Sequence, residues 1–379
     1  PKCPRCSLVG LCLPDETTAL TAGIPGDAGE GQQEEPAVRR LFPARYDALP
    51  MYVQEQGAYV RRSGDRVIVT REGETKADVR VIDVSQLCLM GNVQISSQAL
   101  RDLASRGIPI CHFSYAGWFT AITTGHTSKN IELRQSQFRN ASDPASTLRL
   151  ARTFVSAKIL NARTLLRRNH PDKPEAALSL LARMADEARE AQSLQSLLGI
   201  EGTAARTYFS VFKGMLRPSS GEWSFDFEGR NRRPPRDPVN ALLSYAYSLL
   251  LKDLTVTLLA VGFDPYLGFY HQPRYGKPAL ALDLMEEFRP IIADSVVITV
   301  INNGELGPDD FWTRAGGTVL REHGRKKLIR AYERRMETLV RHPVFGYTIS
   351  YRRVLEVQAR LLGRYLLGEI AEYPAFMTR

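Results

Sequence analysis

The sequence predicts an α+β protein in which a small β-rich N-terminal domain precedes a larger all-α domain. Two observations carry this prediction. Between residues 51 and 125, short runs of Val, Ile and aromatic residues alternate with polar residues and stop at turn residues, as β-strands do. From about residue 131, apolar residues recur with the 3.6-residue period of amphipathic helices. The 379 residues are long enough for two domains, so we divide the chain into residues 51–130 and 131–379.

The chain opens with a cysteine cluster, CPRC followed by a third cysteine, formed by Cys3, Cys6 and Cys12. This spacing is typical of a metal or iron–sulfur site, although a four-ligand site lacks one cysteine here. The first residue is Pro1, so we expect it to be an internal position of a longer protein whose upstream part supplies the fourth ligand. The alternative is a disordered tail in which the cysteines occur by chance.

Residues 14–50 are rich in Pro, Gly and acidic residues and show little hydrophobic periodicity. This composition predicts a flexible linker. Met51 then begins a segment that resembles the start of an independent protein. A linker that ends at an internal methionine is what a fusion of two proteins would leave.

Six short segments of the first domain are predicted to be strands: 58–62, 66–70, 78–84, 85–91, 108–113 and 117–122. One capped helix over residues 97–107 is inserted among them and ends at a glycine. The basic and acidic side chains of this domain are nearly balanced. We therefore expect it to serve structure and dimerisation.

The second domain is predicted to be helical throughout. The helical stretches are 145–169, 175–198, 201–216, 237–262, 279–289, 317–341 and 351–371. Asp237 is expected to cap the fourth stretch, with Pro238 in its first position. Pro290 is expected to end the fifth stretch.

A cluster of possible metal ligands lies around this fifth stretch. Asp283 and Glu286 are three residues apart, so both carboxylates face the same way on the predicted helix. Carboxylates that close repel each other unless a cation or a hydrogen-bond network holds them. Together with His271 and Glu201 they would suit a divalent ion that handles phosphate. The alternative is a solvated acidic helix end with an unrelated histidine.

The formal charge of +9 favours a polyanionic partner. The excess lies in the second domain, on one face of its first helix, in a loop with three prolines, and in a later basic tract. The candidate DNA-binding residues are Arg149, Arg152, Arg163, Arg167, Arg232, Arg233, Arg236, Arg325, Lys326 and Lys327. Such stripes are often only solvated faces. Because matching acids are not evident, we interpret them as contacts to a phosphate backbone.

The longest apolar candidate for a membrane span is interrupted by Lys252 and Asp253, so the sequence predicts no membrane association. We find no signal peptide and expect a cytoplasmic protein.

Three stretches in order resemble one known family: LLGIEGTAARTYF, RNRRPPRDPVNALLSYAYSLL and GFDPYLGFYHQPRYGKPALALDLMEEFRPIIADS. The family is the CRISPR adaptation integrase, a metal-dependent endonuclease that inserts spacers into the repeat array. The resemblance covers residues 51–379 and implies a β-rich domain before a helical catalytic domain. It implies Mg²⁺ or Mn²⁺ ligands at Glu201, His271 and Glu286, although the last position is commonly Asp in the family. Asp283 matches a further acidic position near the metal.

The resemblance also implies partners. The family binds double-stranded DNA, both the prespacer and the repeat with its leader, and forms homodimers bridged by a small ferredoxin-fold adaptation protein. The leading cysteines resemble the C-terminal end of a CRISPR-associated RecB-like exonuclease with a 4Fe–4S cluster, which occurs fused to the integrase. The catalytic residues of that nuclease would precede Pro1, so the cluster would be incomplete in this chain.

Two other functions stay open at the level of the sequence. One is a structure-selective metal nuclease in which water attacks the phosphodiester. The other is a non-catalytic DNA-binding scaffold, which would leave a costly buried cluster of acids without a cation.

Overall fold

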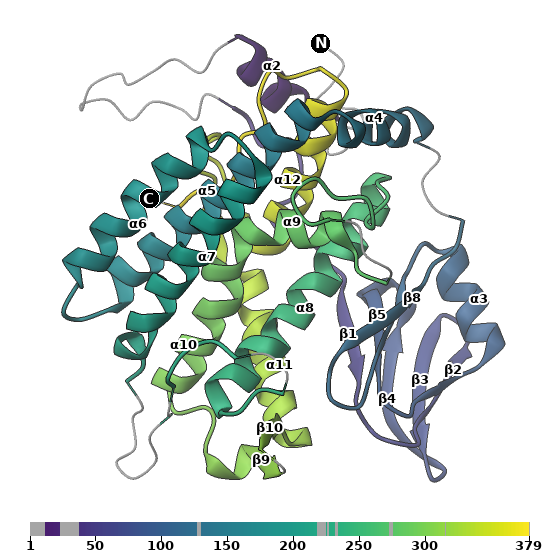
Figure 1. The fold of residues 1–379 in the computed structure, drawn as a ribbon. Coiled ribbons are helices and arrows are strands. Elements are labelled where there is room, and N and C mark those ends of the chain that lie inside the picture. Colours follow the sequence, from purple (N-terminus) through teal and green to yellow (C-terminus); the bar gives the residue numbers. More distant parts are fainter. Residues whose placement is uncertain are drawn as a thin grey trace.

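The computed structural model describes residues 12–22, 38–126, 130–217, 225, 227–231, 234–272, 276–314 and 316–378. The strands of the N-terminal domain gather at one end of the molecule, and the helices that follow fill the rest (Figure 1). The predicted α+β class and the order of the two domains are confirmed.

The N-terminal domain contains two four-stranded sheets. One has the order β1-β5-β7-β8 and the other the order β4-β3-β2-β6. The elements are β1 (Leu49–Val53), β2 (Tyr59–Ser63), β3 (Arg66–Arg71), β4 (Glu74–Arg80), β5 (Val84–Met90), β6 (Gln94–Ile95), α3 (Ser97–Ser105), β7 (Ile110–Phe113) and β8 (Phe119–Thr123).

Strand β5 faces two cores because successive side chains of a strand point to opposite faces. Leu87 and Leu89 belong to a valine-rich cluster that also holds residues of β2 and β3. Cys88 and Met90, on the other face, belong to the large core of the helical domain. A strand that is buried on both faces has consecutive apolar residues, as β5 does from Leu87 to Met90.

The helical domain is built from α4 (Ile131–Ser142), α5 (Pro144–Asn169), α6 (Glu175–Glu190), α7 (Leu194–Val211), α8 (Pro238–Val261), α9 (Ala279–Phe288), α10 (Ser295–Asn302), α11 (Glu322–Glu337) and α12 (Tyr351–Leu366). The predicted start of α8 is confirmed, since the Asp237 side chain accepts a hydrogen bond from the Asn240 backbone N–H. Gly262 ends α8 in the left-handed region with a φ of 112°, which favours glycine.

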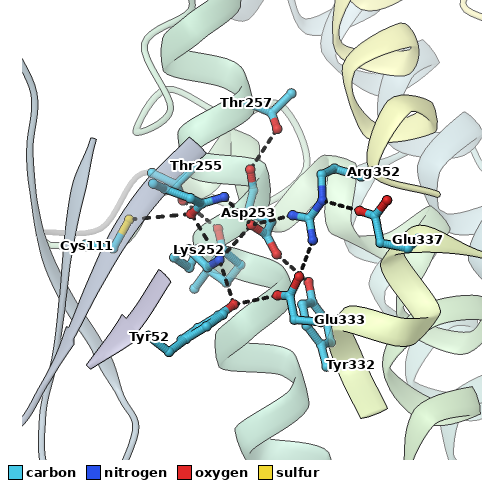
Figure 2. A network of polar contacts seen from close by, with 12 residues as sticks. Tyr52, Cys111, Lys252, Asp253, Thr255, Thr257, Tyr332, Glu333, Glu337 and Arg352 are labelled. Carbon is cyan, nitrogen blue, oxygen red and sulfur yellow. Dashed lines mark hydrogen bonds and ion pairs between the residues drawn. The ribbon is translucent and has the colours of Figure 1, made fainter. Parts of the chain in front are cut away.

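A buried polar network joins the two domains (Figure 2). It starts at Lys252 and Asp253 in the middle of α8. The Lys252 ammonium contacts Asp253 at 2.7 Å, Gln86 of β5 at 3.0 Å and the Tyr52 hydroxyl of β1 at 3.2 Å. Since both charges of α8 are compensated, the helix can run through the core despite them.

The same network continues into the two C-terminal helices. Arg352 of α12 forms ion pairs with Glu333 and with Glu337 of α11, the latter at 2.9 Å. Tyr52 donates a hydrogen bond of 2.7 Å to Glu333, which brings β1 into the same chain of contacts (Figure 2). The network therefore ties β1, β5, α8, α11 and α12 together.

Helix α8 is long and apolar enough to cross a membrane by length and composition alone, but 72% of the relevant window is buried inside the protein. A core helix passes the same test, and the network of Lys252 and Asp253 shows α8 to be one.

The prediction that Pro290 ends a helix is wrong. After α9 the chain widens into a π-helical turn, Arg289–Asp294, and continues directly as α10. Proline has no N–H to donate to the carbonyl four residues earlier, and the wider turn accommodates it.

Four other predicted helices have different bounds. The stretch 201–216 begins earlier, at Leu194, and the stretch 351–371 ends earlier, at Leu366. The stretch 175–198 is interrupted after α6, because Ser193 caps a new helix, α7. The stretch 317–341 begins with strand β10 (Gly317–Leu320), which pairs with the preceding β9 (Phe311–Arg314), before α11. It ends in β11 (Leu339–Arg341), which pairs with β12 (Thr348–Ser350).

The predicted linker, residues 14–50, contains ordered parts. Pro14–Ala22 forms helix α2, and Leu13 beside it is 1% exposed. Further on, the Arg353 guanidinium of α12 lies 3.6 Å from the ring centroid of Tyr46 and 5.8 Å from that of Phe42. The prediction of a flexible linker does not hold for Pro14–Ala22, which is helical, whereas Phe42 and Tyr46 have no regular structure but contact α12. Of the predicted cluster ligands, Cys12 is exposed, whereas Cys3 and Cys6 lie outside the described residues.

Candidate active site

Four predicted residues meet where α5, α7 and α9 approach the loop that follows α8. Glu201 lies on α7, Asp283 and Glu286 lie on α9, and His271 lies in the loop. Asp283 is 0% exposed and Glu286 is 2% exposed. The alternative of a solvated acidic helix end is therefore wrong.

Asp283 holds the histidine loop in place. Its Oδ1 accepts hydrogen bonds from the His271 backbone N–H at 2.7 Å and from His271 Nδ1 at 2.8 Å. Its Oδ2 accepts from the backbone N–H groups of Phe269 at 2.6 Å and Tyr270 at 3.0 Å. These four contacts use the acceptor capacity of the carboxylate, so Asp283 orients His271.

The loop can approach Asp283 this closely because residue 268 is glycine. A Cβ at Gly268 would lie 2.8 Å from Asp283 Oδ2 and 2.8 Å from the backbone carbon of Ala279. Any larger side chain would push the loop away from α9.

The orientation of His271 leaves its second ring nitrogen facing Glu286. With Nδ1 hydrogen-bonded to Asp283, Nε2 lies 3.8 Å from Glu286 Oε1. A histidine whose far nitrogen is fixed by a carboxylate is the usual arrangement of a metal-ligating imidazole.

Lys158 of α5, which the sequence analysis did not select, lies between the two glutamates. Its ammonium forms an ion pair with Glu201 and lies 2.7 Å from Glu286 Oε2. Burial alone would lower the pKa of Lys158, but the charges of Glu286 and Glu201 outweigh burial and raise it. A signal for Lys158 was present, since it interrupts the apolar stripe of Phe154, Val155 and Ala162.

Glu286 stays ionised inside the protein. Burial alone would raise its pKa, but Arg289, Lys158 and His271 lower it to about 2. The Arg289 Nε lies 3.1 Å from Oε1, while Oε2 has no hydrogen-bond partner in spite of the nearby ammonium. Arg289 is the second residue of this site that the sequence analysis missed, and its signal was a basic side chain one turn after Glu286.

Within the described residues, no three His, Cys, Asp or Glu side chains are spaced to hold one metal ion as they stand. The donor set nevertheless fits a divalent cation. Two carboxylates and an imidazole nitrogen converge from three segments, and one buried carboxylate oxygen, Glu286 Oε2, lacks a hydrogen bond. The position between the two glutamates is filled by the Lys158 ammonium.

A cavity opens beside this cluster. Its lining includes Lys158, Glu201, Phe209, Arg230 and Arg289. The guanidinium groups of Arg230 and Arg289 place positive charge on the side of this cavity next to the carboxylates.

Tyr270 borders the cluster from the histidine loop. Its hydroxyl donates to Glu201 Oε2 at 3.1 Å, and burial together with the charge of Glu201 raises its pKa. Tyr270 therefore fixes the orientation of Glu201 and stays protonated.

The arginines of α5 divide into two kinds. Arg152 Nε donates to the carbonyl of Ala191 at 2.7 Å, and Arg163 Nε donates to the carbonyl of Leu178 at 2.9 Å. These two side chains fasten α6 to α5. Arg149 and Arg167 are exposed.

The later basic tract does have matching acids, so the prediction of an unpaired stripe is wrong there. Arg325 is 4% exposed and donates to the carbonyl of Leu320. Lys326 lies 2.9 Å from Glu322, and Lys327 lies 2.8 Å from Asp310. In the proline-rich loop, Arg236 is exposed. The predicted residues Arg232 and Arg233 lie outside the described residues.

With the fold and the cluster in view, the molecule has a β-rich domain, a helical domain and a buried carboxylate–histidine site between helices. A family model described as CRISPR associated protein Cas1 matches residues 51–334. The chain therefore belongs to the Cas1 family.

Several relatives agree with this assignment. A CRISPR-associated exonuclease Cas4/endonuclease Cas1 fusion of Geobacter sulfurreducens is 52% identical over 388 aligned residues, covering all of this chain and 67% of the fusion. A CRISPR-associated endonuclease Cas1 of Thermus thermophilus is 40% identical, covering 87% of this chain and 97% of that protein. The chain spans about two thirds of the length of the fusion relatives.

Among solved structures, a casposase bound to an integration product matches with a TM-score of 0.75 and 22% identity. It covers 87% of this chain and 94% of that chain. This likeness shows a shared fold.

Proposed function

We propose that the protein is a CRISPR adaptation integrase that joins new spacer DNA to the repeat array by metal-dependent strand transfer. Family membership supports a nuclease enzyme, since relatives bear the name endonuclease. The observation that carries the finer proposal is that Glu201 and Glu286 meet at the Lys158 ammonium, while His271 Nε2 lies 3.8 Å from the other oxygen of Glu286.

In the proposed reaction, the 3′-hydroxyl of the incoming DNA gives up its proton to water as its oxygen forms a bond to a phosphorus atom at the repeat edge. The bond from that phosphorus to the 3′-oxygen of the repeat strand breaks, and the leaving oxygen takes up a proton. Mg²⁺ or Mn²⁺, when bound by Glu201, His271 and Glu286, would polarise the phosphate and stabilise the leaving oxygen.

The other residues of the site prepare this chemistry. Asp283 fixes the ring of His271, so that Nε2 is presented to the cation position. Tyr270 holds Glu201, and the nearby guanidinium of Arg289 offers positive charge to a phosphate. No protein nucleophile is needed, because the DNA supplies its own hydroxyl.

We propose that the partners are the double-stranded prespacer and repeat DNA, a second copy of the chain, and a small ferredoxin-fold protein that bridges two dimers. In the casposase, which shares the fold, an integration product is accommodated. The fusion relatives favour an upstream iron–sulfur exonuclease, to whose cluster Cys3, Cys6 and Cys12 would belong. Such a system acts on DNA in the cytoplasm.

The test uses a short duplex with free 3′-hydroxyl ends, a plasmid carrying a repeat, Mn²⁺ and the bridging protein. We expect covalent joining of the duplex to the plasmid. The same duplex with 3′-dideoxy ends should give no product, and neither should the Glu286→Gln variant with intact ends. If the duplex is never joined while branched DNA is cut equally with either end, the protein is a nuclease that uses water.

A further inference from the structure

We propose that Lys158 is an internal counterion of the metal site: its ammonium holds Glu201 and Glu286 together in the metal-free protein and yields this position when a divalent cation binds. The inference rests on the metal site of the proposed function. It assigns a positioning role to a residue of α5 that lies outside the predicted ligand set.

Glu201 and Glu286 need a positive charge between them. Glu201 and Glu286 come from different helices, and their side chains are 19% and 3% exposed. Two ionised carboxylates that share one buried space repel each other unless a positive charge lies between them. Lys158 supplies this charge and contacts both, with its own side chain 18% exposed.

Lys158 is the side chain that supplies this charge to both glutamates. Arg289 also faces Glu286, but it contacts Oε1 from the other side, at 3.1 Å. Asp283 and His271 are occupied with each other. Among the described residues, Lys158 is therefore the cation that joins α7 to α9 within the cluster.

The Lys158 ammonium and a divalent ion would exclude each other from the position between the two glutamates. Both would use the same oxygens of Glu201 and Glu286, and positive charges that close in a partly dry site repel strongly. Glu286 Oε2 is held by the ammonium 2.7 Å away and has no other polar partner within hydrogen-bond geometry, so a divalent ion could bind this oxygen only in place of Lys158.

The displaced Lys158 ammonium can move into the neighbouring cavity. Lys158 lines the cavity beside the cluster, together with Phe209, Arg230 and Arg289. A lysine carries its charge on a flexible four-carbon stem, so it can swing into this space without any movement of α5. A DNA phosphate in the cavity would receive it.

The experiment compares Mn²⁺ binding to the wild-type protein and to Lys158→Met by titration calorimetry and thermal unfolding, with no DNA present. Without metal, we expect Lys158→Met to unfold several degrees lower, because the two glutamates lose their counterion. Saturating Mn²⁺ should close most of this gap, and Mn²⁺ should bind the variant at least about tenfold more tightly. Arg183→Met, at an exposed position of α6, should leave both quantities unchanged.

Equal Mn²⁺ affinity and equal Mn²⁺-induced stabilisation in wild type and Lys158→Met would overturn the proposal. If neither protein binds Mn²⁺, the metal site of the proposed function fails instead. Lys158→Arg tests the same point if the Met variant does not fold. A larger fixed cation should weaken Mn²⁺ binding about tenfold, and unchanged affinity would again overturn the proposal.

Discussion

At the scale of single residues, the site depends on side chains that never touch the cation position. Asp283 accepts three backbone N–H groups and the imidazole of His271, all between 2.6 and 3.0 Å. A carboxylate in this role determines both where the histidine loop lies and which nitrogen of the ring is available.

We therefore expect Asp283→Asn to reduce Mn²⁺ affinity and strand transfer by about 10- to 100-fold, as the loss of an outer partner of a metal ligand does. The amide would also turn an N–H toward a backbone N–H, which should cost about 1–3 kcal/mol of unfolding free energy. Calorimetric titration and urea unfolding would measure the two effects. Unchanged Mn²⁺ affinity would show that Asp283 does not position His271 for the cation.

Asp294 predicts a pH dependence of stability. Burial raises its pKa from 3.8 to about 6, against the hydrogen bonds that the Tyr247 and Tyr208 hydroxyls donate at 2.6 and 3.0 Å. Because the folded-state pKa is above the ordinary value, the folded state binds the proton more tightly. This contribution to stability is present below pH 4 and is lost as the pH rises through 6.

Asp294→Asn removes this titration. The stability of the wild type relative to Asp294→Asn should fall between pH 4 and pH 7, by no more than about 3 kcal/mol for a pKa difference near two. Urea unfolding of both proteins across this range measures the difference. A constant difference would show that the carboxyl is ionised throughout.

At the scale of elements, α5 has two faces with different tasks. One face carries Lys158 and the apolar stripe into the protein, and its flanks fasten α6 through Arg152 and Arg163. Arg149 and Arg167 are exposed. The helical period of the sequence placed Arg149, Arg152, Arg163 and Arg167 on one side of the helix. It does not reveal which of these side chains donate hydrogen bonds to backbone carbonyls.

This division predicts opposite outcomes for two similar changes. Arg152→Ala should lower the unfolding free energy by about 1–3 kcal/mol, because it leaves the carbonyl of Ala191 without its charged donor. It should leave the salt dependence of DNA binding nearly unchanged. Arg167→Ala should leave stability unchanged and reduce the slope of log affinity against log salt by about 0.9, the value of one phosphate contact.

Urea unfolding and fluorescence anisotropy at several salt concentrations would measure these effects on unrelated duplexes. If Arg152→Ala flattens the salt slope as much as Arg167→Ala, Arg152 contacts DNA as well as α6. An effect confined to one duplex would indicate base recognition.

At the scale of the whole molecule, the two domains are joined through charge as well as through apolar packing. Lys252 and Asp253 on α8, with Arg352 and Glu333 from the C-terminal helices, form a balanced set of charges beside β1 and β5 (Figure 2). A balanced buried set is costly to disturb at one member, because the remaining charges lose their compensation.

Lys252→Met should therefore lower the unfolding free energy by about 3–5 kcal/mol, the usual cost of breaking a buried ion pair from one side. Lys76→Met, which removes an exposed ion pair of β4, is the matched control and should cost less than about 1 kcal/mol. Urea unfolding followed by far-UV circular dichroism measures both. A Lys252→Met protein as stable as Lys76→Met would mean that the network adds no net stability to the join between the domains.

The order of the domains was predictable from the sequence. Before residue 131 apolar residues alternate, as in strands buried on one face, and after it they recur every 3.6 residues, as in helices buried along one side. The ligand residues were identified through the family resemblance and the spacing of Asp283 and Glu286. The role of Lys158 was not predictable, since its partners lie 43 and 128 positions away along the chain. The continuation of the helix beyond α9 was missed because a π-turn has no composition signal of its own apart from the proline that it accommodates.

The π-turn Arg289–Asp294 joins α9 and α10 into one continuous helix and determines how far α10 is rotated relative to α9. Glu286, before the turn, faces His271, and Asp294, the last residue of the turn, faces Tyr208 and Tyr247. A deletion of one residue within the turn would allow an ordinary α-helical repeat, apart from the missing N–H of Pro290. Because a π-helical turn differs from an α-helical one by about one extra residue per turn, such a deletion would leave the residues that follow in nearly the same angular phase. The wide turn therefore takes in one more residue without rotating α10 relative to α9, so that Asp294 meets its tyrosines while Glu286 faces His271.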